Sequence, residues 1–257
     1  MPKNLVLRPN DGHFDLPAVR SWLDSRPDAL LDPVGTDAYM LCGLPNSIWA
    51  RREARLGDPS RFPRGGLLFL QPEQILLRQE SADAEELRSG MEFMRWMWGQ
   101  FSLTVREDGG QDFTELCRRE GVEVLYPERL RDAPLPWAGR LIRVGFYREL
   151  DHGDGDDPSL EALQAEQAAP DEDRMLAYLD AGHLYIASPG IVEDVLADRE
   201  TWIGPAHLLT DGTYVWPADL VYYLRTYHVR LPTSFWVHAR RNDFQIPADV
   251  DVASLQL

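Results

Sequence analysis

The sequence contains almost no lysine and very little cysteine. Of its 26 basic side chains only Lys3 is a lysine, and the two cysteines are Cys42 and Cys117. A phosphate-binding loop of the GxxxxGK[ST] type is therefore excluded, and lysine Schiff-base chemistry of the pyridoxal phosphate kind is nearly excluded. Zinc and iron–sulfur sites need more ligands than two separated cysteines supply. We expect both cysteines to be reduced and buried, and we expect no cofactor.

Long apolar runs are also missing. No stretch approaches the roughly 20 apolar residues that a helix needs to cross a bilayer. The opening residues, MPKNLVLRPNDG, lack the basic-then-apolar pattern of a signal peptide. We therefore expect a soluble, cytoplasmic protein that does not enter a membrane. A hydrophobic content of 44% over 257 residues is enough for a real core, in one large domain or two modest ones.

Negative charge is abundant and unevenly distributed. The net charge is −16, and residues 151–173 contribute nine acidic side chains and no basic one. Such a surface repels the phosphates of nucleic acids and anionic membranes, so we expect neither as a partner. A basic protein is the partner that this charge favours.

The pattern of apolar residues over 1–150 predicts an α+β domain, with a mixed or antiparallel sheet packed by helices. The expected strands are Asn4–Arg8, Ala38–Cys42, Gly66–Leu70, Gln74–Arg78, Ser102–Arg106, Val122–Tyr126 and Leu141–Tyr147. The expected helices are Leu16–Arg26, Asn46–Leu56, Ser81–Phe101 and Phe113–Glu120.

Residues 151–173 change character and predict an acidic linker, in which Ser159–Ala169 forms a polar helix. Residues 174–257 then predict a smaller α+β module built on a hairpin and a helix. The hairpin signal is Asp211-Gly212 between two apolar runs, and Pro217 opens the helix Ala218–Tyr227. The other expected elements are the helices Arg174–Ala181 and Pro232–Arg241 and the strand His183–Ala187.

Two sets of residues are candidates for contact with a partner. The acidic set does not match an EF-hand calcium loop, because Gly153, Gly155 or Pro158 falls where that loop needs a ligand. Its members either solvate a linker or face a partner. The aromatic set lines either a core or a contact surface, and a core is the more common place for such residues. The candidates are Asp154, Asp156, Asp157, Asp171, Glu172, Asp173, Tyr214, Trp216 and Tyr222.

The histidines do not form a recognisable metal or catalytic motif, since none pairs at HxH or HxxxH spacing. His183 and His207 are expected to face each other from neighbouring strands. A structural hydrogen bond is the usual role of such a histidine, and general-base catalysis is the alternative. Asp211 and Asp219 are explained locally, by a turn and by the first turn of a helix. No catalytic residue and no metal ligand is assigned.

The stretch Gly182–Pro232, and above all LTDGTYVWPADLVYYL at Leu209–Leu224, resembles a segment of uncharacterised bacterial proteins. Some of these are similar to immunity proteins that neutralise toxins. The resemblance implies a bacterial immunity protein, without enzymatic activity, that occludes a cognate basic toxin domain. Two alternatives stay open. One is a small hydrolase or transferase that uses His183 or His207 as general base, and the other is a regulatory scaffold protein.

Overall fold

The computed structural model describes residues 4–31, 38–41, 66–79, 84–131, 139–155, 157–197 and 201–257. These residues form two compact units, each with its own hydrophobic core. The chain passes from the first unit to the second between Arg131 and Gly139, which corrects our predicted boundary at residue 150. The reason is that Leu141–Tyr147, expected as the last strand of the first domain, supplies a strand to the second unit's sheet.

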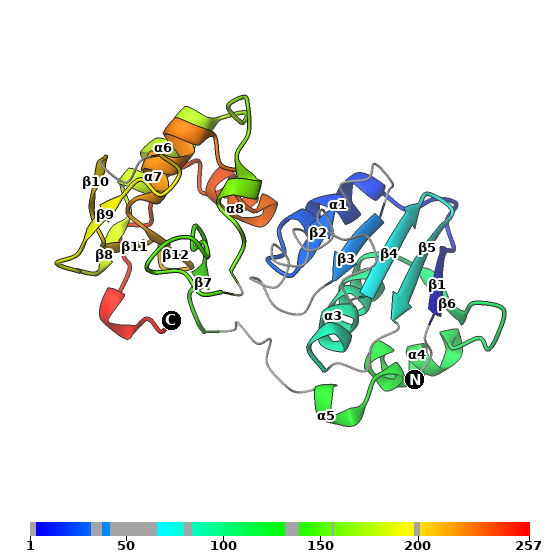
Figure 1. Ribbon diagram of the computed structural model, residues 1–257. Coiled ribbons are helices and arrows are strands. Elements are labelled where there is room, and N and C mark those ends of the chain that lie inside the picture. The colour runs from blue at the N-terminus through cyan, green and yellow to red at the C-terminus, as the bar shows by residue number, and fades with distance from the viewer. Residues whose placement is uncertain are drawn as a thin grey trace. The chain divides into compact units, whose positions relative to one another are not determined.

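The first unit contains a six-stranded antiparallel sheet in the order β2-β3-β4-β5-β1-β6 (Figure 1). Side chains alternate between buried and half-buried along β4 and β5, as expected for strands with one face on a core. The strands are β1 (Asn4–Pro9), β2 (Ala29–Leu31), β3 (Ala38–Leu41), β4 (Gly66–Gln71), β5 (Gln74–Gln79) and β6 (Leu103–Glu107).

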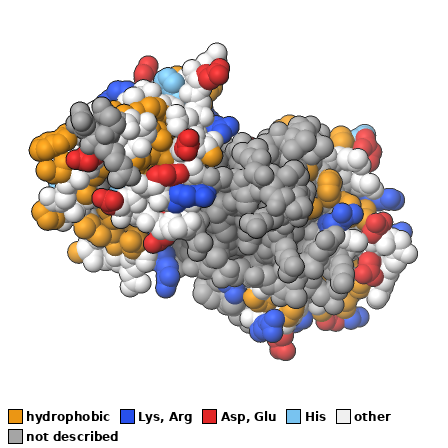
Figure 2. All heavy atoms as spheres, viewed as in Figure 1, with side chains coloured by type: hydrophobic (Ala, Val, Ile, Leu, Met, Phe, Trp, Pro, Cys, Tyr) orange, Lys and Arg blue, Asp and Glu red, His pale blue; other side chains and the backbone are white. Residues whose placement is uncertain are grey.

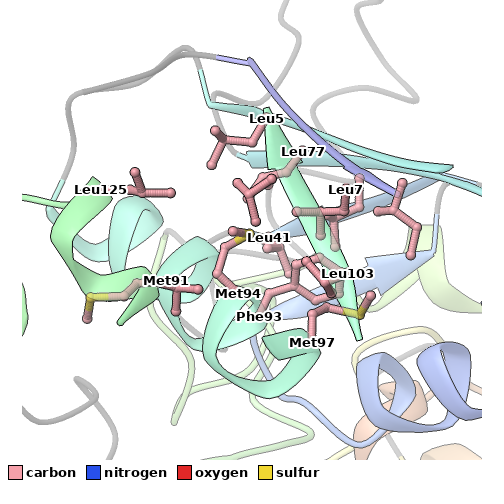
Figure 3. Close-up of a cluster of buried hydrophobic side chains, with 14 of the residues drawn as sticks. Leu5, Leu7, Leu41, Leu77, Met91, Phe93, Met94, Met97, Leu103 and Leu125 are labelled. Atoms are coloured by element: carbon pink, nitrogen blue, oxygen red, sulfur yellow. The ribbon is translucent and has the colours of Figure 1, made fainter. Parts of the chain in front are cut away.

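Helix α3 lies across one face of this sheet and supplies much of its core. Met91, Met94 and Met97 recur at helical spacing and are at most 1% exposed, and they belong to the same buried cluster as Leu5 and Leu7 of β1 (Figure 3). The rings of Trp22 and Trp96 stack 4.9 Å apart and join α1 to α3. The helices are α1 (Leu16–Asp24), α3 (Ala84–Gln100), α4 (Thr114–Glu120), the 3₁₀ helix η1 (Val122–Leu125) and α5 (Glu128–Arg131).

The second unit is built on a four-stranded sheet in the order β7-β12-β11-β8, which leaves β8 at an edge. Strand β7 runs parallel to β12, and the other two pairings are antiparallel. Strands β9 and β10 form a separate antiparallel pair. The strands are β7 (Ile142–Arg143), β8 (His183–Ile186), β9 (Ile191–Glu193), β10 (Trp202–Pro205), β11 (Leu208–Thr210) and β12 (Tyr214–Pro217).

Trp216 of β12 is completely buried and contacts helices on one side of this sheet. Its ring lies 5.8 Å from that of Phe235, and its indole N–H donates to the carbonyl oxygen of Leu179 at 3.2 Å. The Asp211-Gly212 turn joins β11 to β12, as predicted, and Gly212 has a φ of 89° that favours glycine there. The helices are α6 (Glu172–Asp180), α7 (Leu220–Tyr227), α8 (Thr233–Arg241) and the 3₁₀ helices η2 (Glu161–Leu163) and η3 (Val252–Ser254).

The described residues of the acidic segment 151–173 pack into the second unit and do not form a linker. Leu160 is 0% exposed and Leu163 is 7% exposed, and both belong to the core around Trp216. The predicted polar helix Ser159–Ala169 is reduced to the single 3₁₀ turn of η2. Composition alone misled the prediction, because two well-placed leucines are enough to fix a segment that is otherwise charged.

The predicted α+β class is confirmed, with antiparallel sheets packed by helices. One predicted strand is wrong: Val122–Tyr126 contains the 3₁₀ helix η1, which follows Gly121 at a φ of 84° and packs against α3 and α4. Cys117 is free and 1% exposed, as predicted, and burial raises the pKa of its thiol to about 11. Cys42 and the predicted helix Asn46–Leu56 lie outside the described residues.

Candidate functional site

A cleft of about 420 Å³ opens on the second unit where β8, β9 and the loop after β7 meet. Its wall combines apolar side chains with several polar ones, and convergent polar groups on an apolar wall are a feature of binding sites. The apolar residues are Leu150, Ile186, Ile191, Val192, Val195, Ala206 and Leu208. The polar side chains on the cleft are those of Asp151, His152, Ser188 and Glu193.

His152 on this wall is paired with a buried carboxylate behind it. Its Nε2 lies 3.7 Å from Oδ1 of Asp219, the residue that precedes α7. The side chains are 18% and 2% exposed, respectively. Neither Nε2 of His152 nor Oδ2 of Asp219 has a hydrogen-bond partner among the described residues. Buried polar groups in native proteins are almost always satisfied, so this pair is unusual.

Burial moves the pKa values of the two groups in opposite directions. It lowers the pKa of His152 from 6.5 to about 4, opposed by the nearby carboxylate of Asp151. It raises the pKa of Asp219 from 3.8 to about 7. Both shifts favour the uncharged forms, so at pH 6 the pair holds one proton, on Asp219, and presents a neutral imidazole to the cleft.

Ser188 shares the cleft, but its contacts are structural. Its hydroxyl oxygen accepts from the backbone N–H of Gly190 at 3.3 Å, and its own N–H donates to Nδ1 of His207 at 3.1 Å. No hydrogen bond joins Ser188 to His152 within the described part of the chain. The residues therefore do not form the serine–base pair that nucleophilic catalysis requires.

Large exposed apolar side chains lie on the three strands β8, β9 and β10, two of which border the cleft. They are Leu184 (52% exposed) and Ile186 (43%) on β8, Ile191 (55%) on β9 and Trp202 (70%) on β10. We call these four residues the apolar rim, and two of them, Ile186 and Ile191, also line the cleft. Figure 2 shows hydrophobic side chains gathered at the end of the second unit where Figure 1 places β8, β9 and β10. Several exposed apolar side chains on neighbouring strands are a feature of interaction sites.

The charge around the cleft is negative. Asp151 and Glu193 line it and are exposed, and neither takes part in an ion pair with another described residue. Residues 139–257 as a whole carry 20 acidic and nine basic side chains, a net charge of −11. A positively charged group is thus favoured both at long range and at the cleft itself.

The acidic candidates within 151–157 are held by the protein's own arginine. Arg143 donates to Oδ2 of Asp154 at 3.2 Å and to Oδ2 of Asp157 at 2.9 Å. Asp154 is exposed and remains available to a partner, whereas Asp157 is 4% exposed and is not. Asp156 lies outside the described residues.

The acidic candidates at the start of α6 are split in the same way. Glu172 is 7% exposed, with Oε1 2.8 Å from Nδ1 of His228, so its role is internal. Asp171 pairs with Arg240 at 3.1 Å on the surface, and Asp173 is exposed. For Asp157 and Glu172 the structure therefore corrects the prediction of a partner-facing side chain.

Two of the three aromatic candidates are core residues. Tyr214 is 3% exposed and Trp216 0%, which corrects their proposed contact role and agrees with the core alternative. Tyr222 is half-buried, and its hydroxyl donates to Oδ2 of Asp194 at 3.0 Å. Asp194, itself 1% exposed, ties α7 to the end of β9.

His183 and His207 do not face each other. His183 of β8 lies opposite Thr210, whereas His207 precedes Leu208, which lies opposite Ile186 at the other end of the strand. Nε2 of His183 donates to the carbonyl oxygen of Pro247 at 2.8 Å. Each histidine thus has a structural hydrogen bond, and the geometry gives no support to an active site built on them.

The sequence reasoning missed His152, Asp219 and the apolar rim. His152 was hidden in a segment interpreted as a linker, and Asp219 was explained by its position before a helix. The alternation His183-Leu184-Tyr185-Ile186 was visible, but a strand pattern does not tell which face remains uncovered.

Comparison with protein-family models, with curated proteins and with solved structures found no match for this chain. The resemblance to immunity proteins therefore stays a prediction. In the described part of the chain, no helix is long and apolar enough to cross a membrane, and no group of three or more His, Cys, Asp or Glu side chains could hold a metal ion.

Proposed function

We propose that this chain is a non-enzymatic binding protein whose second unit contacts a protein partner through the apolar rim and the cleft. The observation that carries the proposal is the position of the exposed apolar side chains. Among the described residues, five large hydrophobic side chains are exposed; four of them lie on β8, β9 and β10, and two of these four line the cleft. Trp202, 70% exposed, has the size and chemistry of the anchors that dominate protein interfaces.

The partner that fits is a basic protein domain, and the proposed role is that of an immunity protein that occludes a cognate toxin. The net charge of −16 supports a basic partner, because opposite charge accelerates encounter through electrostatic steering. The resemblance of Leu209–Leu224 to immunity-like proteins supports the toxin as partner. The apolar rim would set the dissociation rate, since contacts buried at the centre of an interface act mainly on that rate.

The experiment is co-expression with the toxin domain encoded beside this chain's gene, followed by binding kinetics on the purified pair. Replacing Trp202 and Ile191 by alanine is expected to weaken binding by at least about tenfold, since each truncation removes about 1 kcal/mol or more. Leu257→Ala is the matched control, because Leu257 is 50% exposed but lies outside the rim.

Three results would each contradict a different part of the proposal: the immunity role, the contact surface and steering by charge. If the toxin is not neutralised, the immunity role is wrong, and a regulatory scaffold with another partner takes its place. If the rim variants bind as tightly as the Leu257→Ala control, the contact surface is wrong. If the association rate is the same at 50 mM and 500 mM salt, steering by charge is wrong.

A further inference from the structure

Strand β8 leaves one of its edges without a partner strand. It is the last strand of its sheet and pairs only with β11, through His183–Ile186. Among the described residues, no backbone hydrogen bond joins the other edge of β8 to any group. The 3₁₀ helix η3 packs near β8 but, among the described residues, makes no backbone hydrogen bond to it. The edge of β8 therefore still presents N–H and C=O groups that can pair with another chain.

The side chains of β8 do not protect this edge. Natural sheets protect an exposed edge with charged side chains, proline or a β-bulge. Strand β8 (HLYI) contains neither a proline nor a formally charged side chain, and its one irregularity is a register shift against β11 between Leu208 and Leu209. Leu184 and Ile186 are half exposed, whereas His183 bonds to Pro247 and Tyr185 packs beside the buried Leu141, Phe146 and Val215. His183 and Tyr185 are thus anchored to the second unit, whereas Leu184 and Ile186 remain exposed and can cover an added strand.

The far end of β8 leads directly into the cleft. Ile186 ends the strand and lines the cleft, and Ser188 and Ile191 line it further along the chain. A peptide that pairs along the open edge of β8 and continues past Ile186 would bring one of its side chains to the mouth of the cleft, next to the carboxylates of Asp151 and Glu193. Four residues of β8 give only a few main-chain hydrogen bonds, so this additional contact is needed for a stable complex.

The charge decides between the possible occupants of the edge. A second copy of this chain would bring together two molecules of net charge −16, which repel each other. A segment that carries lysine or arginine meets complementary charge at Asp151 and Glu193. The geometry points to β8 as a site of strand addition for an extended, positively charged segment of the partner, with one basic side chain seated in the cleft. This inference rests on the proposed protein-binding function for the source of the segment.

The test uses the full chain and a defined probe, a capped, fluorescent octapeptide of alternating valine and arginine. Binding is followed by anisotropy, and hydrogen exchange is followed at His183–Ile186. We expect saturable binding and slower exchange of the β8 amides in the complex. The matched control is the same peptide with N-methyl groups on alternate amides, made in both registers. It keeps the charge but cannot donate hydrogen bonds to β8 from one side, so one register is expected to bind at least about tenfold more weakly.

A pair of variants separates strand addition from general attraction between opposite charges. Ile186→Lys places a positive charge at the mouth of the cleft, whereas Leu257→Lys makes the same charge change on another exposed apolar side chain. We expect Ile186→Lys to weaken binding by at least about tenfold and Leu257→Lys to change it by less than about threefold. Equal losses in the two variants would overturn the inference.

Three further outcomes also overturn it: equal binding of both methylated peptides and the parent, unchanged exchange at β8, and protection of β8 by dimerisation in the absence of peptide. The peptide result is independent of any toxin. If the peptide adds to β8 but no toxin is neutralised, only the proposed immunity role fails. If neutralisation depends on Trp202 while β8 exchange is unaffected by the toxin, only strand addition fails.

Discussion

The buried pair of His152 and Asp219 makes a prediction with a definite sign. In the folded chain burial puts the pKa of His152 at about 4 and that of Asp219 at about 7, whereas the ordinary values are 6.5 and 3.8. Between pH 4 and 6.5 the folded pair holds one proton, on Asp219, and the unfolded pair also holds one, on the histidine. The dependence of stability on pH follows the difference in bound protons between the folded and unfolded states. The intact pair therefore contributes almost nothing to the pH dependence of stability in this range.

Substituting one member of the pair makes the pH dependence due to the other member measurable. In Asp219→Asn the remaining His152 binds a proton only when the chain is unfolded, so stability rises with pH by about 2 kcal/mol from pH 5 to 6.5, at about 1.4 kcal/mol per pH unit. In His152→Phe the remaining Asp219 binds a proton only in the folded state, so stability falls by about 2 kcal/mol over the same range. The phenylalanine ring retains the edge-on contact that His152 makes with Phe146.

The assay is urea denaturation, followed by tryptophan fluorescence, at pH 5.0, 5.5, 6.0 and 6.5. Each variant's free energy of unfolding is compared with that of the unmodified chain at the same pH, which cancels the contributions of all other titrating groups. For the double variant we expect this difference to be independent of pH. Parallel curves for both single variants would refute burial as the cause of the shifts. A charged imidazole at His152 at pH 6, seen by NMR in the unmodified chain, would show that the pair is an ion pair.

Three other substitutions or deletions test the packing of the second unit. Asp211→Ala removes the acceptor for Tyr178 and His238, at 2.5 and 3.0 Å, and is expected to cost about 3 kcal/mol in urea denaturation; a loss below about 1 kcal/mol would contradict its structural role. Gly182→Ala places a methyl group 2.6 Å from the ring of Trp216 and is expected to cost about 1 to 3 kcal/mol by the same assay, unlike Gly155→Ala, where the space is open. Deleting residues 151–173 removes buried leucines from the core and is expected to abolish the cooperative unfolding transition of the second unit; an unchanged transition would restore the linker interpretation.

Much of the secondary structure was predictable because its signals are local. The methionines of α3 recur at helical spacing, and the alternation in β4 and β5 has the period of a strand with one buried face. The Asp211-Gly212 turn needs only its own two residues to be recognised. These patterns depend on neighbours in the chain, so no knowledge of the fold was required.

The predictions that were wrong concern segments whose structure depends on contacts with residues distant in the sequence. Val122–Leu125 has strand-like composition, but no strand in the described part of the chain pairs with it, and it forms a 3₁₀ turn that packs against α3. The segment 151–173 has the composition of a linker, but Leu160 packs into a core that includes residues of α6, α7 and α8. Propensity is a weak prior that such tertiary contacts override.

By itself the sequence determined the α+β class, the net charge of −16, from which we predict that nucleic acid is not a partner, and the absence of the lysine that phosphate-loop chemistry needs. The tertiary structure alone decided which polar and apolar groups are available. It buried Tyr214 and Trp216, left Leu184 and Ile186 exposed on an edge strand, and placed His152 against Asp219 across 67 residues of chain. The physical reason is that exposure and pKa are set by what surrounds a side chain in space, which spacing along the chain does not specify.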